Sequence, residues 1–212
     1  MLKVNLGYVI SYVLCNGIGV FYTSFSLAGN AQTTTIFEAK FGWSKDETIL
    51  YNTIITSSAI VGLLIGSLLG GYLIKHGRRK GAILANIIGI VGAVITMVAT
   101  IPFLTFGRLL VGVAAGVYNV IFPKMIVENM PVQLSQRLAM CHSASIQVGL
   151  VVAYGLGGIL PDPKDAEASK QDELWRFIFL VPAFIGTFEL ILTLLVFRQE
   201  PIAYCIMMGY EE

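Results

Sequence analysis

Six long stretches of apolar residues, separated by short polar or charged segments, dominate the chain. They cover about residues 6–29, 50–73, 82–101, 103–126, 138–160 and 175–197. A helix needs about 20 mostly apolar residues to cross a bilayer. Backbone groups must be satisfied inside the bilayer, and the stretches lack the alternation of a β-barrel, so we expect helices. The pattern predicts an all-α membrane protein with six transmembrane helices.

The segments between these stretches differ in character. Residues 30–47 are a polar stretch, 75–80 form a short basic turn, and 162–173 form an acidic loop. We therefore expect one six-span bundle over 1–198 and a short tail over 199–212. The first apolar stretch is too long for the core of a signal peptide, so we expect it to insert without removal.

Composition agrees with a membrane location and excludes several functions. The chain is 56% hydrophobic and 13% charged, whereas a soluble domain usually carries about 25% charge. Its net charge of +1 offers no general basic field for nucleic acid. Three scattered cysteines and the lack of a CxxC, HExxH or phosphate-loop motif indicate no metal and no cofactor. No catalytic constellation is evident, so we do not expect an enzyme.

Basic residues are unevenly divided between the two sides that six spans would create. One side holds Lys3, Lys75, Arg78, Arg79, Lys80, Lys124, Arg137 and Arg198. The other holds Lys40, Lys45, Lys164 and Lys170, with Arg176 at its edge. Basic residues near spans favour the cytoplasmic side. We therefore expect both termini in the cytoplasm or matrix, and a plasma membrane or an organellar inner membrane fits equally.

Small and polar residues recur inside the apolar stretches. Gly62, Gly66 and Gly70 are spaced by four residues, as are Gly112 and Gly116. Glycines at this spacing let helices approach closely, either for static packing or for sliding. A buried arginine costs about 2.5–3.5 kcal/mol on insertion scales. Arg108 is thus expected to face a cavity or partner, or, as the alternative, to extend to the interface.

Other polar residues inside the stretches need partners and are expected to point into the bundle. They are Asn16, Thr23, Ser24, Tyr118, Asn119 and His142. One helical face of the fifth stretch carries a stripe at i, i+4, i+7 and i+11. It is formed by Ser143, Gln147, Leu150 and Tyr154.

Four segments, in order, carry a resemblance to a known family. They are 70–79 with its Gly77-Arg78-Arg79 turn, 107–137, 149–158, and 175–182 with Trp175, Arg176 and Pro182. The second segment includes Gly107, Arg108, Gly112, Gly116, Pro123, Glu128, Pro131 and Arg137. Together they resemble the N-terminal half of a major facilitator superfamily transporter, most like the sugar porter branch. The resemblance implies six helices forming one half of that fold.

The resemblance also implies roles for particular residues. Arg78, Arg79, Glu128 and Arg137 would form a cytoplasmic ion-pair cluster that gates the transporter, with solvated loop charge as the alternative. Gly70, Gly77, Gly112 and Gly116 would form its packing motif. Candidate solute-binding residues are Thr23, Arg108, Asn119, Gln147, Leu150 and Tyr154.

Three positions depart from the family pattern. Ile74 stands where the family's loop has an aspartate, which weakens the expected ion-pair cluster. Thr23 stands where proton-coupled members pair an aspartate with the arginine corresponding to Arg108, which argues against proton coupling. Leu150 stands where the family has a sugar-contacting glutamine, and Gln147, one turn earlier, could substitute for it.

Three functional hypotheses remain open, because the family has two six-span halves and this chain ends at Glu212. The first is facilitated movement of a small polar solute, possibly a sugar, by a half-size unit in the lipid bilayer. Such a unit would pair with a second half, by homodimerisation or with a separate chain. The second is an accessory subunit of a larger membrane complex. The third is a fragment of a longer transporter.

Overall fold

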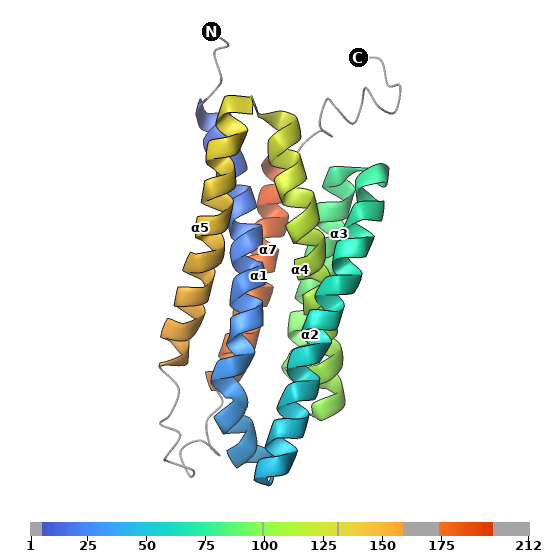
Figure 1. Ribbon diagram of the computed structural model, residues 1–212, viewed down its shortest axis with the longest axis vertical. Coiled ribbons are helices and arrows are strands. Elements are labelled where there is room, and N and C mark those ends of the chain that lie inside the picture. Colours follow the sequence, from blue (N-terminus) through green and yellow to red (C-terminus); the bar gives the residue numbers. More distant parts are fainter. Residues whose placement is uncertain (1–5, 99, 131, 159–173, 197–212) are drawn as a thin grey trace.

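Six long helices run side by side in the computed structural model (Figure 1), which describes residues 6–98, 100–130, 132–158 and 174–196. They are α1 (Leu6–Phe41), α2 (Lys45–Leu73), α3 (Arg78–Thr96), α4 (Ile101–Asn129), α5 (Val132–Gly157) and α7 (Leu174–Val196). A 3-10 turn, Ile74–His76, joins α2 to α3. Each long helix contains a segment long and apolar enough to cross a membrane. The prediction of six helical spans is confirmed.

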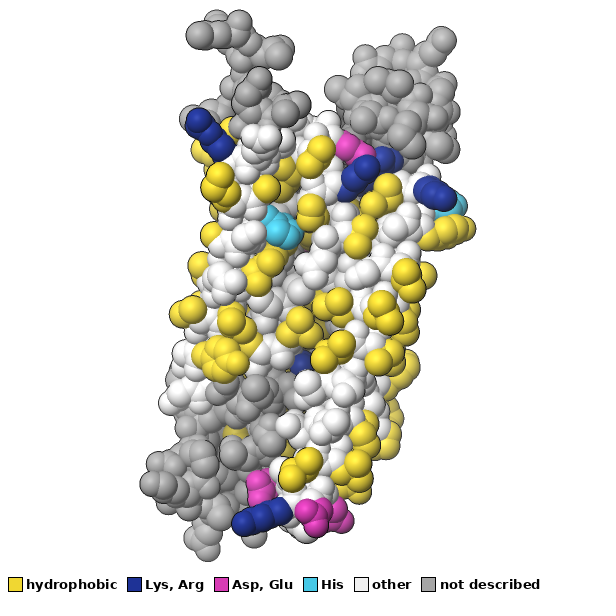
Figure 2. Space-filling model, in the orientation of Figure 1, with side chains coloured by type: hydrophobic (Ala, Val, Ile, Leu, Met, Phe, Trp, Pro, Cys, Tyr) yellow, Lys and Arg dark blue, Asp and Glu magenta, His cyan; other side chains and the backbone are white. Residues whose placement is uncertain are grey.

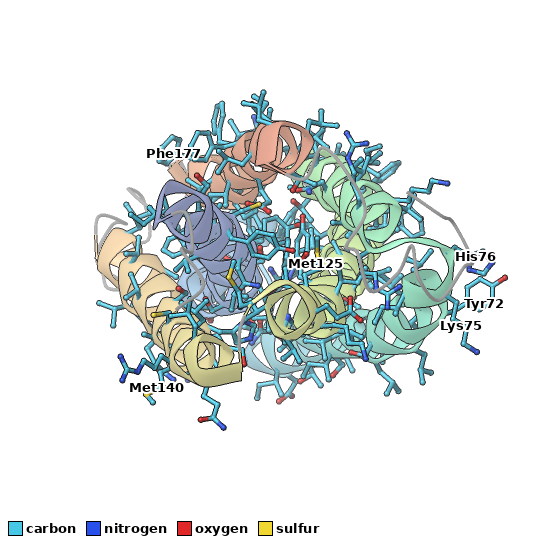
Figure 3. All side chains as sticks on the ribbon, turned by 90° about the horizontal axis from the view of Figure 1, so that it is seen from above. Tyr72, Lys75, His76, Met125, Met140 and Phe177 are labelled. Carbon is cyan, nitrogen blue, oxygen red and sulfur yellow. The ribbon has the colours of Figure 1, made fainter. Side chains whose placement is uncertain are left out.

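Helix α4 lies at the centre of the contacts, packing against α1, α2 and α3. Helix α1 also packs against α5 and α7, and α7 closes the bundle against α3. Viewed from above, α5 lies at one side with its outer surface uncovered (Figure 3). Tyr22 and Tyr118 meet edge to face in the core, with ring centroids 5.3 Å apart.

The first helix is much longer than its apolar stretch, since it continues beyond the predicted end near residue 29 as far as Phe41. The extension is held by apolar contacts, because Ile36 and Phe37 are buried and pack with Trp175 and Phe179 of α7. The helix ends where Gly42 adopts a positive φ of 65°, a conformation that glycine adopts without steric cost. Hydropathy alone does not reveal such an extension, because its polar residues lower the average hydropathy of the segment.

Helix α2 begins at a capping box formed by Ser44 and Glu47. Ser44 Oγ accepts from the Glu47 amide at 3.3 Å, and Glu47 Oε2 accepts from the Ser44 amide at 2.9 Å. This reciprocal arrangement satisfies two donors that a helix start otherwise leaves free. The helix therefore begins before the apolar stretch does.

The other boundaries shift by a few residues from the predicted spans. Helices α3 and α5 begin earlier than residues 82 and 138, because polar residues continue the helix beyond its apolar part. Helix α3 ends at Thr96 rather than 101, and α4 begins at Ile101 with Pro102 in its first turn, where proline is well tolerated. The predicted acidic loop at 162–173 and tail at 199–212 lie outside the described residues.

The glycine repeats bring α2 and α4 into backbone contact. A Cβ added at Gly62 or Gly66 would collide with the carbonyl oxygens of Leu109 and Val113. One added at Gly112 or Gly116 would collide with carbonyl oxygens on α2. The expected close approach of these helices is therefore present in the structure, and it leaves no room for larger side chains.

Charged side chains gather at the two ends of the bundle, as the space-filling view shows on its visible face (Figure 2). The surface between the ends is mainly apolar and small or neutral polar. Large apolar residues of the helices, such as Leu64, Leu68 and Phe184, are exposed. This distribution suits a bilayer, where apolar side chains face the hydrocarbon and charges lie near water.

Candidate functional site

Arg78 and Glu128 form an ion pair that joins the start of α3 to the end of α4. Arg78 Nε donates to Glu128 Oε2 at 2.9 Å, and Nη2 donates to Oε1 at 2.7 Å. Arg78 Nη1 donates to the Ile74 carbonyl oxygen at 3.1 Å. The side chain of Arg78 is only 1% exposed. The two-point geometry of this guanidinium–carboxylate pair makes it strong and directional.

The turn before Arg78 requires a glycine. Gly77 has a φ of 123° and immediately precedes α3. Side chains rarely tolerate this backbone conformation. Gly77 therefore acts at least through the shape of the turn, which brings Arg78 to Glu128.

The four residues predicted to form one cluster are not all joined. Arg79 lies beside Arg78 and is half-buried, whereas Arg137 is exposed. Among the described residues, Arg137 makes no ion pair with Glu128. Lys124, which sequence analysis did not assign to the cluster, lies one turn before Glu128 with Nζ at 3.9 Å from Oε1.

Arg108 is buried against α1. Its exposed fraction is 2%, which contradicts the alternative in which it extends to the membrane interface. Nη1 donates to the Ser26 carbonyl oxygen, and Nη2 donates to that of Leu27 at 3.4 Å. Its Cζ lies 5.8 Å from the centroid of the Phe179 ring. Main-chain carbonyls and an aromatic face therefore stabilise this cation, without a carboxylate contact in the described part of the bundle.

A small internal cavity adjoins this arginine. It measures about 10 Å³ and is lined by Arg108, Ser26, Thr96 and neighbouring apolar residues. That volume suffices for about one water molecule. Arg108 Nε has no hydrogen-bond partner within the described segments. A single water is the ligand that the size of this cavity fits, and a sugar is far too large for it.

Thr23 and Asn119 are more buried than the predicted solute residues on α5. Thr23 is 5% exposed, and its hydroxyl donates to the Gly19 carbonyl oxygen at 3.4 Å. Asn119 of α4 is half-buried. Neither contacts Arg108 through a hydrogen bond in the part that the structure describes. The structure therefore does not join these three residues into one polar cluster.

The stripe on α5 faces outward. Ser143 and Gln147 are exposed, and Leu150 and Tyr154 have exposed fractions of 36% and 52%. The predicted solute residues thus divide into an internal set on α1 and α4 and an external set on α5. They share a site only if something covers the open face of α5.

An apolar groove runs between α1 and α5. Its volume is about 420 Å³. It is lined by Val13, Leu14, Gly17, Ile18, Phe21, Cys141, Ala144, Ser145 and Val148. Beside it, His142 Nδ1 lies 3.1 Å from Asn16 Oδ1 and connects the two helices. The groove gives the α1–α5 side a concave surface.

Sequence analysis missed a buried acid on α7, Glu189. Its carboxylate accepts hydrogen bonds from Cys15 Sγ at 3.1 Å and from Thr193 Oγ1 at 3.2 Å. The sequence did contain a signal for this residue. Glu189 lies within the sixth apolar stretch, and an ionisable residue inside a span is a candidate for a functional role.

Comparison with known proteins places this architecture in a family. The family model described as "Sugar (and other) transporter" matches residues 13–212. Hexose transporter 1 of Toxoplasma gondii is 27% identical over 217 residues, covering 95% of this chain and 38% of that protein. A probable inositol transporter 3 of Arabidopsis thaliana is 28% identical over 149 residues, covering 69% of this chain and 26% of that protein.

Solved structures show the same fold. A proton:xylose symporter of the major facilitator superfamily, bound to 6-bromo-6-deoxy-D-glucose, superposes with a TM-score of 0.86 at 19% identity. The match covers 98% of this chain and 48% of the symporter chain. The chain thus spans less than half the length of these relatives. It belongs to the family described as "Sugar (and other) transporter", and it has the fold of the N-terminal six-helix half of a major facilitator superfamily transporter.

Proposed function

We propose that this chain is one half of a transporter that moves a small polar solute of the sugar or polyol class. The solute would pass between these six helices and a second six-helix unit. The names of its relatives, which specify hexose and inositol, support this solute class. The second unit is a second copy, a separate chain or a continuation of the same chain.

The exposed polar stripe on α5 carries this proposal. Ser143, Gln147 and Tyr154 offer hydroxyl and amide groups on a face that the described helices leave open. Polar groups facing a bilayer lack partners, so such a stripe is better placed against protein or a wet cavity. Sugars are recognised by side chains of this kind, which donate to and accept from hydroxyl groups.

The partners of Arg108 support facilitated movement, without proton coupling at that residue. Its charge meets the carbonyl oxygens of Ser26 and Leu27, which do not titrate. Thr23 bonds to the backbone of its own helix. A solute that reaches this region therefore displaces no proton from an arginine–carboxylate pair.

The Arg78–Glu128 pair supports a gating role at the end of the bundle that carries the basic turn. It joins the start of α3 to the end of α4 at one end of the bundle, where a second unit could add or remove partners. We place this end, with both termini, on the cytoplasmic or matrix side, because basic residues gather there. Arg79 and Arg137, on α3 and α5 of this unit, would contact groups of the second unit in the same region.

Counterflow into proteoliposomes tests the transport proposal. The full chain, purified in mild detergent with any partner that accompanies it, is reconstituted and loaded with unlabelled hexose, xylose or myo-inositol. Saturable uptake of the matching labelled solute is expected. Lack of saturable uptake of every solute, with or without the partner, contradicts the proposal. If the chain is recovered only within a large complex that moves no solute, the hypothesis of an accessory subunit is supported.

Replacing Gln147 with alanine is expected to raise the half-saturating solute concentration by about tenfold. The expected change equals the loss of one or two hydrogen bonds to the solute, each worth about 0.5–1.5 kcal/mol. Thermal stability should stay unchanged because Gln147 is exposed in the six-helix unit. Val152→Ala, on a different face of the same helix, is the matched control and should leave both quantities unchanged. Equal effects of the two substitutions on the half-saturating concentration would show that Gln147 does not contact the solute.

A further inference from the structure

Glu189 is an acidic side chain on α7 that the proposed solute path does not use. It is fully buried, with an exposed fraction of 0%. Its Oε1 accepts from Cys15 Sγ and Thr193 Oγ1. Its Oε2 has no hydrogen-bond partner among the described residues. One oxygen of this carboxyl group is therefore stabilised, and the other is not.

The groups that α1 and α4 turn toward Glu189 are uncharged at neutral pH. Cys15 of α1 donates to the carboxylate, and Tyr118 of α4 belongs to the same core cluster as Cys15. The Tyr118 hydroxyl donates to Asn86 Oδ1 of α3 at 2.7 Å. On the same face of α1, Tyr22 packs on the Tyr118 ring, and the Tyr12 hydroxyl accepts from Asn129 Nδ2 at the end of α4.

No cation faces Glu189 from the neighbouring helices, as far as the structure describes them. The titratable residues of α3 are Arg78, Arg79 and Lys80, all in its first turn. Arg78 is bound to Glu128, and Lys80 is exposed. On α5, His142 is engaged with Asn16 of α1. Within the described residues, Glu189 takes part in no ion pair.

We propose that Glu189 is a proton-binding site inside the bundle, and that its protonation controls solute flux through this unit. A buried carboxylate without a cation is costly, so the group is neutralised by a proton instead. Binding adds one proton to Oε2 and removes one negative charge. Release returns that proton to water, and no other bond changes.

The control of flux follows from the helices that Glu189 connects, and this part rests on the proposed function. The Cys15–Glu189 contact joins α1 to α7. The same helix α1 carries Thr23 and both carbonyl partners of Arg108. Ionising Glu189 places an unpaired charge between α1 and α7, which favours entry of water and separation of the helices. The protonated form is therefore the one that supports flux.

Carbodiimide labelling tests the proton site without any substitution. Dicyclohexylcarbodiimide reacts with protonated carboxyl groups in apolar surroundings, and mass spectrometry locates the adduct. In the full chain reconstituted in lipid, we expect labelling of Glu189 that declines as the pH rises. Glu47, which is exposed at the start of α2, is the internal comparison and should remain unlabelled. Absence of labelling at Glu189, or labelling independent of pH, overturns the proposal.

Solute counterflow at a series of pH values tests the control of flux. The wild-type rate should fall about tenfold per pH unit above the midpoint, whereas Glu189→Gln should vary by less than about twofold. Thr187→Val, on the same helix but exposed, should keep the wild-type profile. Identical profiles for wild type and Glu189→Gln overturn the proposal.

The experiments distinguish failure of the transport proposal from failure of the proton-site proposal. If the wild type moves no solute at any pH, the transport proposal fails, and labelling still decides whether Glu189 binds a proton. If an imposed pH gradient drives accumulation in the wild type but not in Glu189→Gln, the proton site is supported and facilitated movement is contradicted.

Discussion

Replacing Gly66 with leucine is expected to abolish the folded bundle or destabilise it by about 3 kcal/mol or more, at or beyond the upper end of typical overpacking costs. A Cβ at this position would collide with the Val113 carbonyl oxygen of α4. A backbone atom in a packed helix cannot move aside as a flexible side chain can, so α2 and α4 would have to separate. Thermal unfolding in detergent, with recovery of monodisperse protein, measures the effect.

Gly71→Leu is the matched control for this prediction. Gly71 is on the same helix, and an added Cβ there has no neighbour within 4 Å. Its unfolding midpoint should equal the wild-type value or exceed it slightly, because leucine favours a helix over glycine by roughly 0.8 kcal/mol. If Gly66→Leu unfolds at the same temperature as Gly71→Leu, the close α2–α4 contact does not hold the bundle together.

Replacing Glu128 with glutamine is expected to lower the free energy of unfolding by about 3 kcal/mol, near the lower end for breaking a buried ion pair. The substitution keeps the shape of the side chain but leaves the Arg78 guanidinium, with a side chain only 1% exposed, without its carboxylate. Denaturation by a graded detergent or denaturant series measures the difference. We expect local loosening first where α3 begins and α4 ends, because the pair joins those two positions.

Lys124→Gln separates this effect from general loss of charge. Lys124 is 51% exposed in its side chain and lies 3.9 Å from the same carboxylate. Exposed ion pairs contribute about 0–1 kcal/mol, so this substitution should have a small effect that added salt reduces further. If Glu128→Gln costs no more than Lys124→Gln, the Arg78–Glu128 pair is not a stabilising element.

The hydrophobic pattern predicted the six helices because each stretch must satisfy its own backbone in the bilayer. It predicted helix ends less well, since ends are set by side-chain contacts and caps. The extension of α1 to Phe41 depends on aromatic residues of α7 that are far away in sequence. The start of α2 depends on the Ser44–Glu47 capping box, a local signal that hydropathy does not contain.

In the candidate site, too, the sequence predicted some contacts, and the packing of distant helices decided the others. Arg78 and Glu128 were expected to meet, and they do, but Arg137 is exposed and Lys124 takes a place near the pair. The sequence allowed Arg108 either to face a cavity or partner or to extend to the membrane interface. Only the position of α1 decides that its partners are carbonyl oxygens. The hydrogen bonds of Glu189 come partly from Cys15, at the opposite end of the sequence.

The sequence by itself determined that this protein is a six-span membrane bundle with basic turns, glycine-lined helix contacts and a family resemblance, because those properties lie in composition and short-range spacing. Tertiary structure alone decided which polar groups are paired, which face the open side of α5, and which are buried without a partner. Those outcomes depend on helices from distant parts of the chain meeting in the core, and no local pattern specifies such meetings.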